Sequence, residues 1–424
     1  MIDIYRPIRI LAVAAALLAV APSGARGQAA PRRVTLEQAL ALFATNNVAL
    51  RVARAEAAEA AALARQAAAY PNPELSASHE PLAGAGRSYA ESYLNLSQRL
   101  QWPATRSARE SAAERIAAAA SARLVADSAR LAFGVKQAWL TAALAERSAA
   151  LLERVTGVFR SAERSAEVRL REGDISVYDV RRIAVERIRY ENALAEAALE
   201  AASARRMLAL MVLAEADELE LAAADTLGST PPALDSARVV SAALARRSEI
   251  AAAAAELGAA RADARVARSG RVPDVTATGG FKRQSDGLSG AYLGISIPMP
   301  VWDRRAGAID AAGSRVSAAL ARQADTERKV RNDVTRALLA FTSYQARTNM
   351  LGDPLTEAGD LLTIAQVAYE AGEMDLIELL DAADALREAQ ALETRLRAGF
   401  WTSYFDLERA VGGFAGSLDN EEDA

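Results

Sequence analysis

The chain contains two copies of one pattern, and this internal repeat constrains the fold more than any other feature of the sequence. Each copy reads as a helix, a pair of short strands, a very long helix, a turn that joins a glycine to an acid, and a further helix. The copies span residues 36–213 and 236–411. A nearly constant offset over most of a chain indicates a structural duplication. The pairs that stand 199 or 200 positions apart include Pro73 and Pro273, Tyr93 and Tyr292, Trp102 and Trp302, and Gly173 and Gly372.

Neither copy could build an ordinary globular core, because each has only two short β segments beside its long helices. We therefore expect the strands to join a shared barrel and the helices to join a shared tube. The composition agrees, since 51% of residues are hydrophobic but only 5% are aromatic, and alanine runs such as 251–255 recur. Such sequences favour long helices that pack closely. The net charge of −4 comes without a basic stripe with interleaved aromatics, so nothing points to nucleic acid.

Residues 1–30 are expected to form an export signal. Arg6 and Arg9 precede an apolar run over 11–20, and small residues follow at 25–30. A membrane anchor is the alternative, but the apolar run is shorter than the roughly 20 residues that a spanning helix needs. The sequence has no cysteine, which excludes disulfides, thiolate metal sites and a lipidated cysteine. We therefore expect an exported protein that is not a lipoprotein.

The first copy, assigned to residues 31–213, is expected to open with a helix from Leu36 to about Tyr70. Thr35 and Gln38 suit a capping box at its start. Residues 73–100 alternate between apolar and polar on both sides of a glycine-rich loop at 81–88, which predicts a β-hairpin. A long helix over 104–172 and a helix over 176–213 follow. The long helix has a coiled-coil-like seam at Leu131, Val135, Ala138, Ala142, Ala145, Ala149, Leu152, Phe159, Ala162 and Ala166.

The second copy, assigned to residues 236–411, repeats these elements. It has a hairpin over 273–299, a long helix over 304–371 with a kink near Pro354, and a helix over 375–411. Residues 214–235 between the copies are expected to be a linker that packs against the tube wall. Residues 412–424 form an acidic tail that is expected to be disordered.

The two hairpins suit a membrane barrel. Each strand has about the length that crosses a bilayer when tilted, roughly 9–11 residues. Two isolated hairpins would be unstable in water, and their open edges are forbidden in lipid. The alternation alone also fits a soluble four-stranded sheet, so this alternative stays open at the level of the pattern. The export signal and the repeat favour the barrel.

Several ordered segments resemble a known family. The clearest is Tyr369-Glu-Ala-Gly372 followed by Leu376-Ile-Glu-Leu-Leu-Asp381, with a first-copy counterpart in Arg171-Glu-Gly173-Asp174 and Val177-Tyr-Asp179-Val. Over nearly all of its mature length the chain resembles the TolC-type outer-membrane efflux proteins. Within that family it looks most similar to the heavy-metal (cobalt–zinc–cadmium) branch. The segments that carry this likeness begin at Tyr70 (YPNPEL), Leu96 (LSQRL) and Gly294 (GISIPMPVWDRR).

The resemblance implies a mainly α protein with a membrane β-barrel contribution. Three identical chains would each give four transmembrane strands to one barrel, and their helices would form a coiled-coil tunnel in the periplasm of a Gram-negative bacterium. It implies contacts with outer-membrane lipid, a periplasmic adaptor and an inner-membrane pump of the RND or ABC type. Such a protein is a passive exit duct of a tripartite efflux system, not an enzyme, and needs no cofactor. The cargo would be metal cations or small toxic compounds.

Three acids are candidates for a periplasmic gate. Glu378 and Asp381 stand three residues apart on a predicted helix, so they share one face. The resemblance implies that acids here ring the periplasmic mouth, favour cations and strengthen the closed state through ion pairs. Asp179 matches the opposing hairpin and is expected to face the same mouth, with Arg181 and Arg182 as partners across the coil. The alternative is a set of solvated surface acids.

Two turns are candidates for adaptor contact. Gly173 and Gly372 are expected to adopt positive φ where the helical hairpins reverse, with Asp174 and Glu373 following them. The resemblance implies that adaptor contacts cluster at these turns, and a purely structural helix cap is the alternative. Trp102 and Trp302 are expected near the junction of barrel and helices, either as an interfacial girdle or as core packing.

The sequence offers no site for metal or catalysis. His79 is the single histidine, and the pair Met207 and Met211 is better explained by helix packing than by soft-metal binding. No nucleophile–base constellation or phosphate loop is visible. Two other functions remain open from the sequence: the exit duct of a type I protein-secretion system, and a soluble periplasmic coiled-coil scaffold or adaptor.

Overall fold

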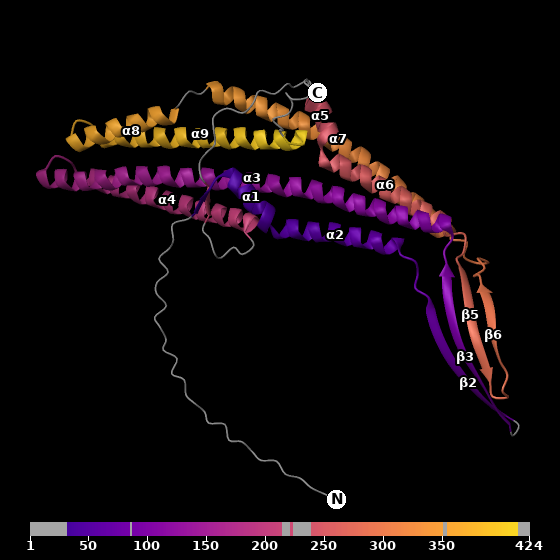
Figure 1. Ribbon diagram of the computed structural model, residues 1–424. Helices are drawn as coiled ribbons and strands as arrows, with labels where there is room; N and C mark the ends of the chain where they lie inside the picture. The colour runs from indigo at the N-terminus through magenta and orange to yellow at the C-terminus, as the bar shows by residue number, and fades with distance from the viewer. Residues whose placement is uncertain (1–31, 85–86, 214–220, 224–238, 351–353, 414–424) are drawn as a thin grey trace, which may run out of the picture.

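The computed structural model describes residues 32–84, 87–213, 221–223, 239–350 and 354–413. The expected signal peptide, most of the linker and the acidic tail beyond Gly413 lie outside these residues. Figure 1 shows an elongated molecule, with long helices side by side along most of its length and a β-sheet at one end. The two turns at which neighbouring helices reverse direction lie at the end opposite the sheet.

The helices and strands follow the order of the predicted repeat. The helices are α1 (Leu36–Asn46), α2 (Val48–Ala68), α3 (Pro103–Glu172), α4 (Val177–Val212), α5 (Val239–Arg246), α6 (Ser248–Ser269), α7 (Ala306–Met350), α8 (Pro354–Ala371) and α9 (Leu376–Val411). The strands are β1 (Arg32–Val34), β2 (Glu74–Gly84), β3 (Arg87–Leu100), β4 (Leu221–Ala223), β5 (Val275–Gln284) and β6 (Ser289–Ser296).

Helix α3 is the spine of the molecule. Its 70 residues correspond to a length of about 105 Å, and it packs against α2, α4, α6 and α9. Pro103 occupies its first position, where a missing backbone N–H costs nothing. The predicted seam is confirmed: every one of its ten residues is buried or half-buried, and Phe159, Ala162 and Ala166 are completely buried. Small seam residues let the neighbouring helix axes approach closely.

The first helix of each copy is broken once, which corrects the expectation of one helix from Leu36 to about Tyr70. Asn47 separates α1 from α2: its side chain accepts a hydrogen bond from the Leu50 amide at 2.8 Å and donates one to the Met211 carbonyl at 2.6 Å. Asparagine is a favoured N-cap, because its side-chain oxygen can accept a hydrogen bond from a backbone amide in the first turn of the new helix. Arg247 takes the equivalent place between α5 and α6, and its guanidinium reaches the Ala410 carbonyl at 3.5 Å. The break is therefore part of the repeat.

The two predicted hairpins join into one antiparallel sheet with the order β2-β3-β5-β6. The strands of the first hairpin are longer than expected, because β2 continues to Gly84 and β3 starts at Arg87 where a loop over 81–88 was predicted. Most apolar residues of the four strands fall on one face, as the alternation predicted, while Leu82 of β2 lies on the other. Leu75 pairs with Leu96, Leu94 with Phe281, and Ala277 with Ile295. This apolar face is uncovered in the single chain, and Leu293 is 91% exposed.

The opposite face of the sheet is polar. It carries Glu91, Tyr93 and Asn95 from β3 beside Lys282 from β5, as the strand register requires. The ammonium of Lys282 lies 2.8 Å from a carboxylate oxygen of Glu91. A sheet with one apolar and one polar face, and with β2 and β6 as unpaired edges within the chain, suits a barrel wall with lipid outside and water inside.

No sequence pattern predicted the small parallel pairing between β1 and β4. It brings part of the expected linker against α3 and α4. The buried Trp139 of α3 holds this pair, since its indole N–H donates to the Val34 carbonyl at 2.9 Å. No described helix is long and apolar enough to cross a membrane.

The second long helix is divided, which corrects the single helix expected over 304–371. Helix α7 ends at Met350 and α8 begins at Pro354. Proline removes a backbone donor and clashes with the preceding turn inside a helix, but it is tolerated in a first turn. The proline that predicted a kink therefore starts a separate helix.

Candidate functional site at the tips of the helical hairpins

The first tip is the reversal between α3 and α4. Gly173 adopts φ +87°, which confirms the left-handed conformation expected there. The amide of Asp174 donates to the Arg169 carbonyl at 2.9 Å, and the amide of Gly173 donates to the Leu170 carbonyl at 3.2 Å. These two bonds satisfy carbonyls that the end of α3 would leave unpaired. The turn is compact and fixed by its own backbone.

Asp179 serves the same turn as a helix cap. Ser176 is the N-cap of α4, and the Asp179 amide donates to its hydroxyl oxygen at 3.2 Å. The Asp179 carboxylate accepts from the Ser176 amide at 3.1 Å and from its hydroxyl at 2.7 Å. This reciprocal capping box contributes about 1 kcal/mol to the start of a helix. One of the predicted gate acids therefore has a structural task in addition to its charge.

The second tip, between α8 and α9, repeats the first. Gly372 adopts φ +78°, and the amide of Glu373 donates to the Ala368 carbonyl at 2.8 Å. The Asp375 amide then donates to the Glu378 carboxylate at 2.8 Å. Glu378 thus stands where Asp179 stands in the first tip, at the third position of the outgoing helix.

Asp381 lies one turn beyond Glu378 on α9. Both side chains are exposed, whereas Leu376, Leu379 and Leu380 of the same helix are buried. Asp179 is half-buried on α4. Within the described part of the chain no ion pair joins these three acids to Arg181 or Arg182, so the predicted partners are not brought together inside one subunit. The structure leaves the exposed pair on α9 free to face another subunit or solvent.

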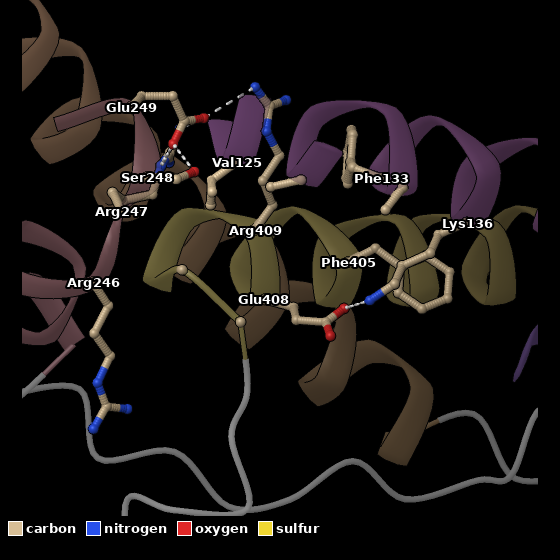
Figure 2. Close-up of a pocket in the computed structure, with 14 residues that line it drawn as sticks. Val125, Phe133, Lys136, Arg246, Arg247, Ser248, Glu249, Phe405, Glu408 and Arg409 are labelled. Atoms are coloured by element: carbon tan, nitrogen blue, oxygen red, sulfur yellow. Dashed lines mark hydrogen bonds and ion pairs between the residues drawn. The ribbon is translucent and has the colours of Figure 1, made fainter. Parts of the chain in front are cut away.

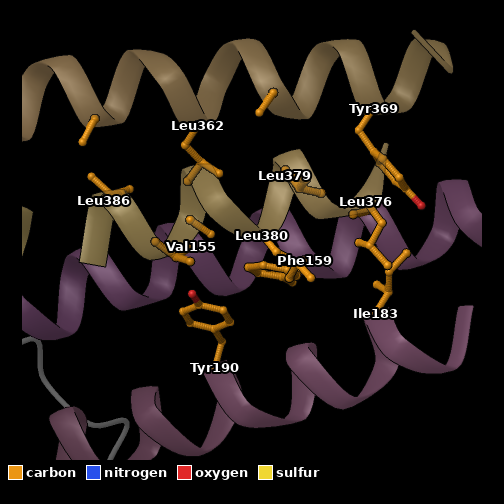
Figure 3. Close-up of a cluster of buried hydrophobic side chains, with 14 of the residues drawn as sticks. Val155, Phe159, Ile183, Tyr190, Leu362, Tyr369, Leu376, Leu379, Leu380 and Leu386 are labelled. Atoms are coloured by element: carbon orange, nitrogen blue, oxygen red, sulfur yellow. The ribbon is translucent and has the colours of Figure 1, made fainter. Parts of the chain in front are cut away.

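A shared apolar cluster holds the two hairpins together behind the tips (Figure 3). Phe159 of α3 stacks on Tyr190 of α4 with ring centroids 4.6 Å apart. Ile183 and Leu379 are completely buried in the same cluster. Burial raises the pKa of Tyr190 to about 12, with the nearby Asp384 adding to the shift. Because α3, α4, α8 and α9 all contribute to this cluster, each tip depends on the other for its support.

Two polar links join α8 directly to α3. The guanidinium of Arg169 donates to the Tyr369 carbonyl at 3.2 Å and lies 5.5 Å from the centre of the Tyr369 ring. The Ser161 hydroxyl donates to Glu370 at 2.8 Å. Burial raises the pKa of Tyr369; Arg169 opposes this shift and the charge of Asp179 adds to it. Asp179 of the first hairpin is thus within electrostatic reach of the second.

A chain of ion pairs stiffens the first hairpin. Arg187 of α4 contacts Glu163 of α3 at 2.6 Å and Glu191 at 2.6 Å, and Glu191 also contacts Arg160 of α3 at 3.1 Å. The hydrogen bond from Arg160 lowers the pKa of Glu191; desolvation opposes the shift and Arg187 reinforces it. Networks of this kind contribute more than isolated surface pairs.

Sequence reasoning missed the residues that fix the tips. Ser176 and Asp375 had a readable signal, since Ser-x-x-Asp and Asp-x-x-Glu stand at the starts of α4 and α9. Arg169 had none, because its contact with Tyr369 joins residues 200 positions apart. Trp102 is placed as expected near the sheet, where its indole donates to the Pro273 carbonyl at 2.8 Å.

A cavity of about 280 Å³ lies at the far end of α9, where α3, α5, α6 and α9 meet (Figure 2). Lys136 of α3 pairs with Glu408 of α9. Arg247 pairs with Glu249 at 2.9 Å, and Arg409 lies 4.9 Å from the centre of the Phe133 ring. Burial opposes ionisation of Glu249, but Arg247 outweighs it and lowers the pKa of that carboxyl. The Lys136–Glu408 pair and the contact of Arg409 with Phe133 fasten the second copy to the spine.

Among the described residues no group of three or more histidine, aspartate or glutamate side chains is placed to hold a metal ion. The hairpin tips therefore present exposed acidic side chains and a defined turn geometry, without a group of described residues that could coordinate a metal ion.

Comparison with known proteins connects this architecture to a family. Residues 239–413 match the family described as outer membrane efflux protein. The chain is 28% identical over 389 residues to the cobalt-zinc-cadmium resistance protein CzcC of Cupriavidus metallidurans, covering 89% of this chain and 90% of that protein. It is 29% identical over 340 residues to the nickel-cobalt-cadmium resistance protein NccC of Alcaligenes xylosoxydans xylosoxydans, covering 77% and 73%.

The fold is that of solved channels. The crystal structure of the CmeC outer membrane channel of Campylobacter jejuni superposes with a TM-score of 0.75 at 17% identity, covering 90% of this chain and 86% of that chain. At this identity the likeness establishes the fold, which agrees with the expected combination of long helices and a four-stranded sheet.

Proposed function

We propose, on the premise that this chain belongs to the outer membrane efflux protein family, that it is the exit duct through which an inner-membrane pump expels divalent metal cations. Proteins of this family are outer-membrane channels with a periplasmic helical tunnel, and they are not enzymes. They work as trimers, together with a periplasmic adaptor and an inner-membrane pump.

One observation supports the proposal most directly: a sheet with an uncovered apolar face lies at one end of the molecule, and long helices with charged exposed sides extend away from it. The sheet has an uncovered apolar face at one end. Helices bearing many charges on their exposed sides run from it for about 105 Å along α3. A duct that spans an outer membrane and reaches far into the periplasm needs both parts. The energy for transport must come from the pump, since the duct has no chemistry of its own.

The metal cargo is proposed from two independent features. The relatives CzcC and NccC are named for resistance to divalent metals and match most of this chain. The exposed acids Glu378 and Asp381 would give the periplasmic mouth a negative potential in a trimer, which raises the local concentration of cations. Metal selectivity would then belong to the pump, and the duct would only favour positive charge.

The two turns are proposed as the adaptor's contact points. Gly173 and Gly372 are exposed at the end of the molecule away from the sheet, and Asp174 and Glu373 follow them with exposed side chains. The two turns have similar backbone geometry, so each subunit would present two similar protruding turns and a trimer would present six. We propose that the inner-membrane pump behind the adaptor is of the RND or ABC type.

Deletion of the gene in its own host tests the cargo. Tolerance to cobalt, zinc and cadmium salts should fall, while tolerance to uncharged toxic compounds should stay unchanged. Reintroduction of the wild-type chain should restore metal tolerance. Unchanged metal tolerance in the deletion strain would contradict the cargo.

Cross-linking tests the adaptor contact. A chain with a photo-cross-linker at Glu373 should capture the adaptor on irradiation. A cross-linker at Leu199, which is 73% exposed on α4 away from the tips, serves as the control.

The type I protein-secretion duct remains as the second candidate. It shares the fold, so the same deletion strain separates it from the efflux duct. Loss of a specific protein from the culture medium, with normal metal tolerance, would favour secretion.

A further inference from the structure

A second cavity, of about 560 Å³, lies where the sheet meets the helices. Its lining combines the base of β3 and β5, Arg109 of α3, and the connections before β5 and after β6. The charged residues in this lining are five arginines and two aspartates: Arg99, Arg109, Arg271, Arg304, Arg305, Asp274 and Asp303. Positive charge therefore dominates the cavity.

Most of that positive charge is uncompensated within the chain. Arg109 contacts Asp274 at 3.5 Å, and Asp303 accepts from the backbone amide of Arg305 at 2.8 Å. Among the described residues no carboxylate forms an ion pair with the guanidinium of Arg99, Arg271 or Arg304. These three side chains therefore line the cavity without a counter-charge of their own.

Backbone strain is present at the same place. Arg305 adopts φ +60°, and it is the one described residue other than glycine with a positive φ. This conformation costs roughly 1–2 kcal/mol for an L-residue, and such strain tends to persist at functional positions. The guanidinium of Arg305 packs against Gly270, where any side chain would collide with it.

The arginines do not follow from the internal duplication. The positions equivalent to Arg271, Arg304 and Arg305 in the first copy are Pro71, Ala104 and Thr105. Three of the five cavity arginines are therefore specific to the second copy, whereas Arg99 and Arg109 come from the first.

The strand register shows which side of the sheet the cavity faces. Arg99 pairs with Thr276 and both line the cavity. They belong to the alternate positions that include Glu91, Tyr93 and Lys282, which form the polar face. If the apolar face contacts lipid, the polar face and this cavity open toward the lumen.

We propose that this cavity is an anion-attracting site, and that in the trimer its three copies form a guanidinium collar around the lumen at the junction of barrel and tunnel. The inference rests on the proposed function, since it needs the polar face to be the lumen. The ligand is a small or polyvalent oxyanion, such as phosphate or a carboxylate, which arginine recognises with its planar fork of donors. The duct is then electrically asymmetric, with acids at its periplasmic mouth and cations at the base of its barrel.

Reversal potentials across planar bilayers of zwitterionic lipid test the collar. The variant Arg99→Gln/Arg271→Gln/Arg304→Gln should raise the permeability ratio of potassium over chloride by about two-fold or more at about 0.1 M salt. The shift should shrink at about 1 M salt, where the Debye length falls from about 10 Å to about 3 Å. The charge-retaining variant with lysine at the same three positions should keep the wild-type ratio.

Arg283→Gln is the matched control, because it removes an arginine of β5 that lies on the apolar face. A second measurement uses the wild-type protein alone: inorganic pyrophosphate added to one side should reduce its conductance, and the glutamine variant should lose this block. An unchanged permeability ratio together with an absence of block would overturn the collar while leaving the channel itself established.

Two further outcomes would place the arginines elsewhere or remove the channel. A shift that arises only in bilayers of anionic lipid would overturn the lumenal collar and assign the arginines to lipid headgroups. A wild-type protein that gives no conductance at all would refute the proposed function, and the collar with it.

Discussion

The two helical hairpins have the same turns but are supported differently. The first hairpin is built from one unbroken helix, α3, and is stiffened by ion pairs that run between α3 and α4 through Arg187 and Glu191. The second arrives through a helix that is divided between α7 and α8. Its polar links run to α3, through Tyr369 and Glu370. The two copies therefore share the turn geometry, but only the first contains the unbroken long helix that forms the spine.

This difference predicts that the two hairpins are stabilised by different sets of contacts. Both hairpins share the cluster around Phe159. The first is stiffened in addition by its own ion pairs, whereas the second is linked to the spine through Tyr369 and Glu370. A change that weakens those links should affect the second hairpin more than the first. Substitutions in the shared cluster should have the strongest effect, and substitutions at exposed charges the weakest.

Phe159→Ala should destabilise both hairpins together. The side chain is completely buried and stacked on Tyr190, and removal of such a ring costs about 3–5 kcal/mol. Thermal unfolding of the helical part in detergent, followed by circular dichroism, measures the loss. Phe341→Ala in the separate cluster of the second copy should leave the tips intact. A loss below about 1 kcal/mol for Phe159→Ala would mean that the cluster does not support the tips.

Gly372→Val should lower efflux while the trimer persists. The turn needs a positive φ, which a β-branched residue adopts only at a cost of roughly 1–2 kcal/mol. Gly372→Asn should be tolerated better, since asparagine visits this conformation. Metal tolerance of the complemented deletion strain and the mass of the purified oligomer are the two readouts. Gly359→Ala in α8 is the control, because a methyl group there meets open space. Wild-type metal tolerance in Gly372→Val would reduce the turn to a helix cap.

Glu378→Gln combined with Asp381→Asn should reduce the cation preference of the channel. Glutamine keeps the acceptor that caps the Asp375 amide, so this change removes charge without removing the cap. Single-channel recordings should show a permeability ratio of potassium over chloride lowered by about two-fold. Asp179→Asn, on the half-buried counterpart in the first hairpin, should have a smaller effect. An unaltered ratio in the double variant would place these acids outside the conducting path.

Acid should weaken the first hairpin through Glu191. The pKa of Glu191 is lowered in the folded protein, so its contribution is present above the pKa of the unfolded state. That contribution is lost as the pH falls through the folded-state pKa. The difference in unfolding temperature between wild type and Glu191→Gln should therefore be small but measurable at neutral pH and should vanish in acid. A difference that does not depend on pH would show that the ion pairs contribute nothing.

The sequence predicted the parts of this molecule that depend on periodicity. Alternation placed Leu94, Phe281 and Ile295 on one face of the sheet, and the register bears this out. The alanine seam of α3 and the positive φ of both turn glycines follow equally directly from local rules.

The rest depends on tertiary contacts that no local pattern encodes. The break at Asn47 exists because its side chain meets the carbonyl of Met211, 164 residues away. The strands β1 and β4 are three residues each, too short for a periodicity signal. The candidate gate acids were predicted from the family motif, but the capping role of Asp179 and Glu378 and the link from Arg169 to Tyr369 needed the structure.

Planar-bilayer recording on detergent-extracted protein, with the oligomer mass determined in the same preparation, decides whether this chain forms a duct. We expect a trimer that gives discrete conductance steps, with a cation preference set at the periplasmic mouth. A protein that stays in aqueous solution without detergent, remains a monomer and forms no channel would show that the sheet never enters a membrane and that the chain is not a duct.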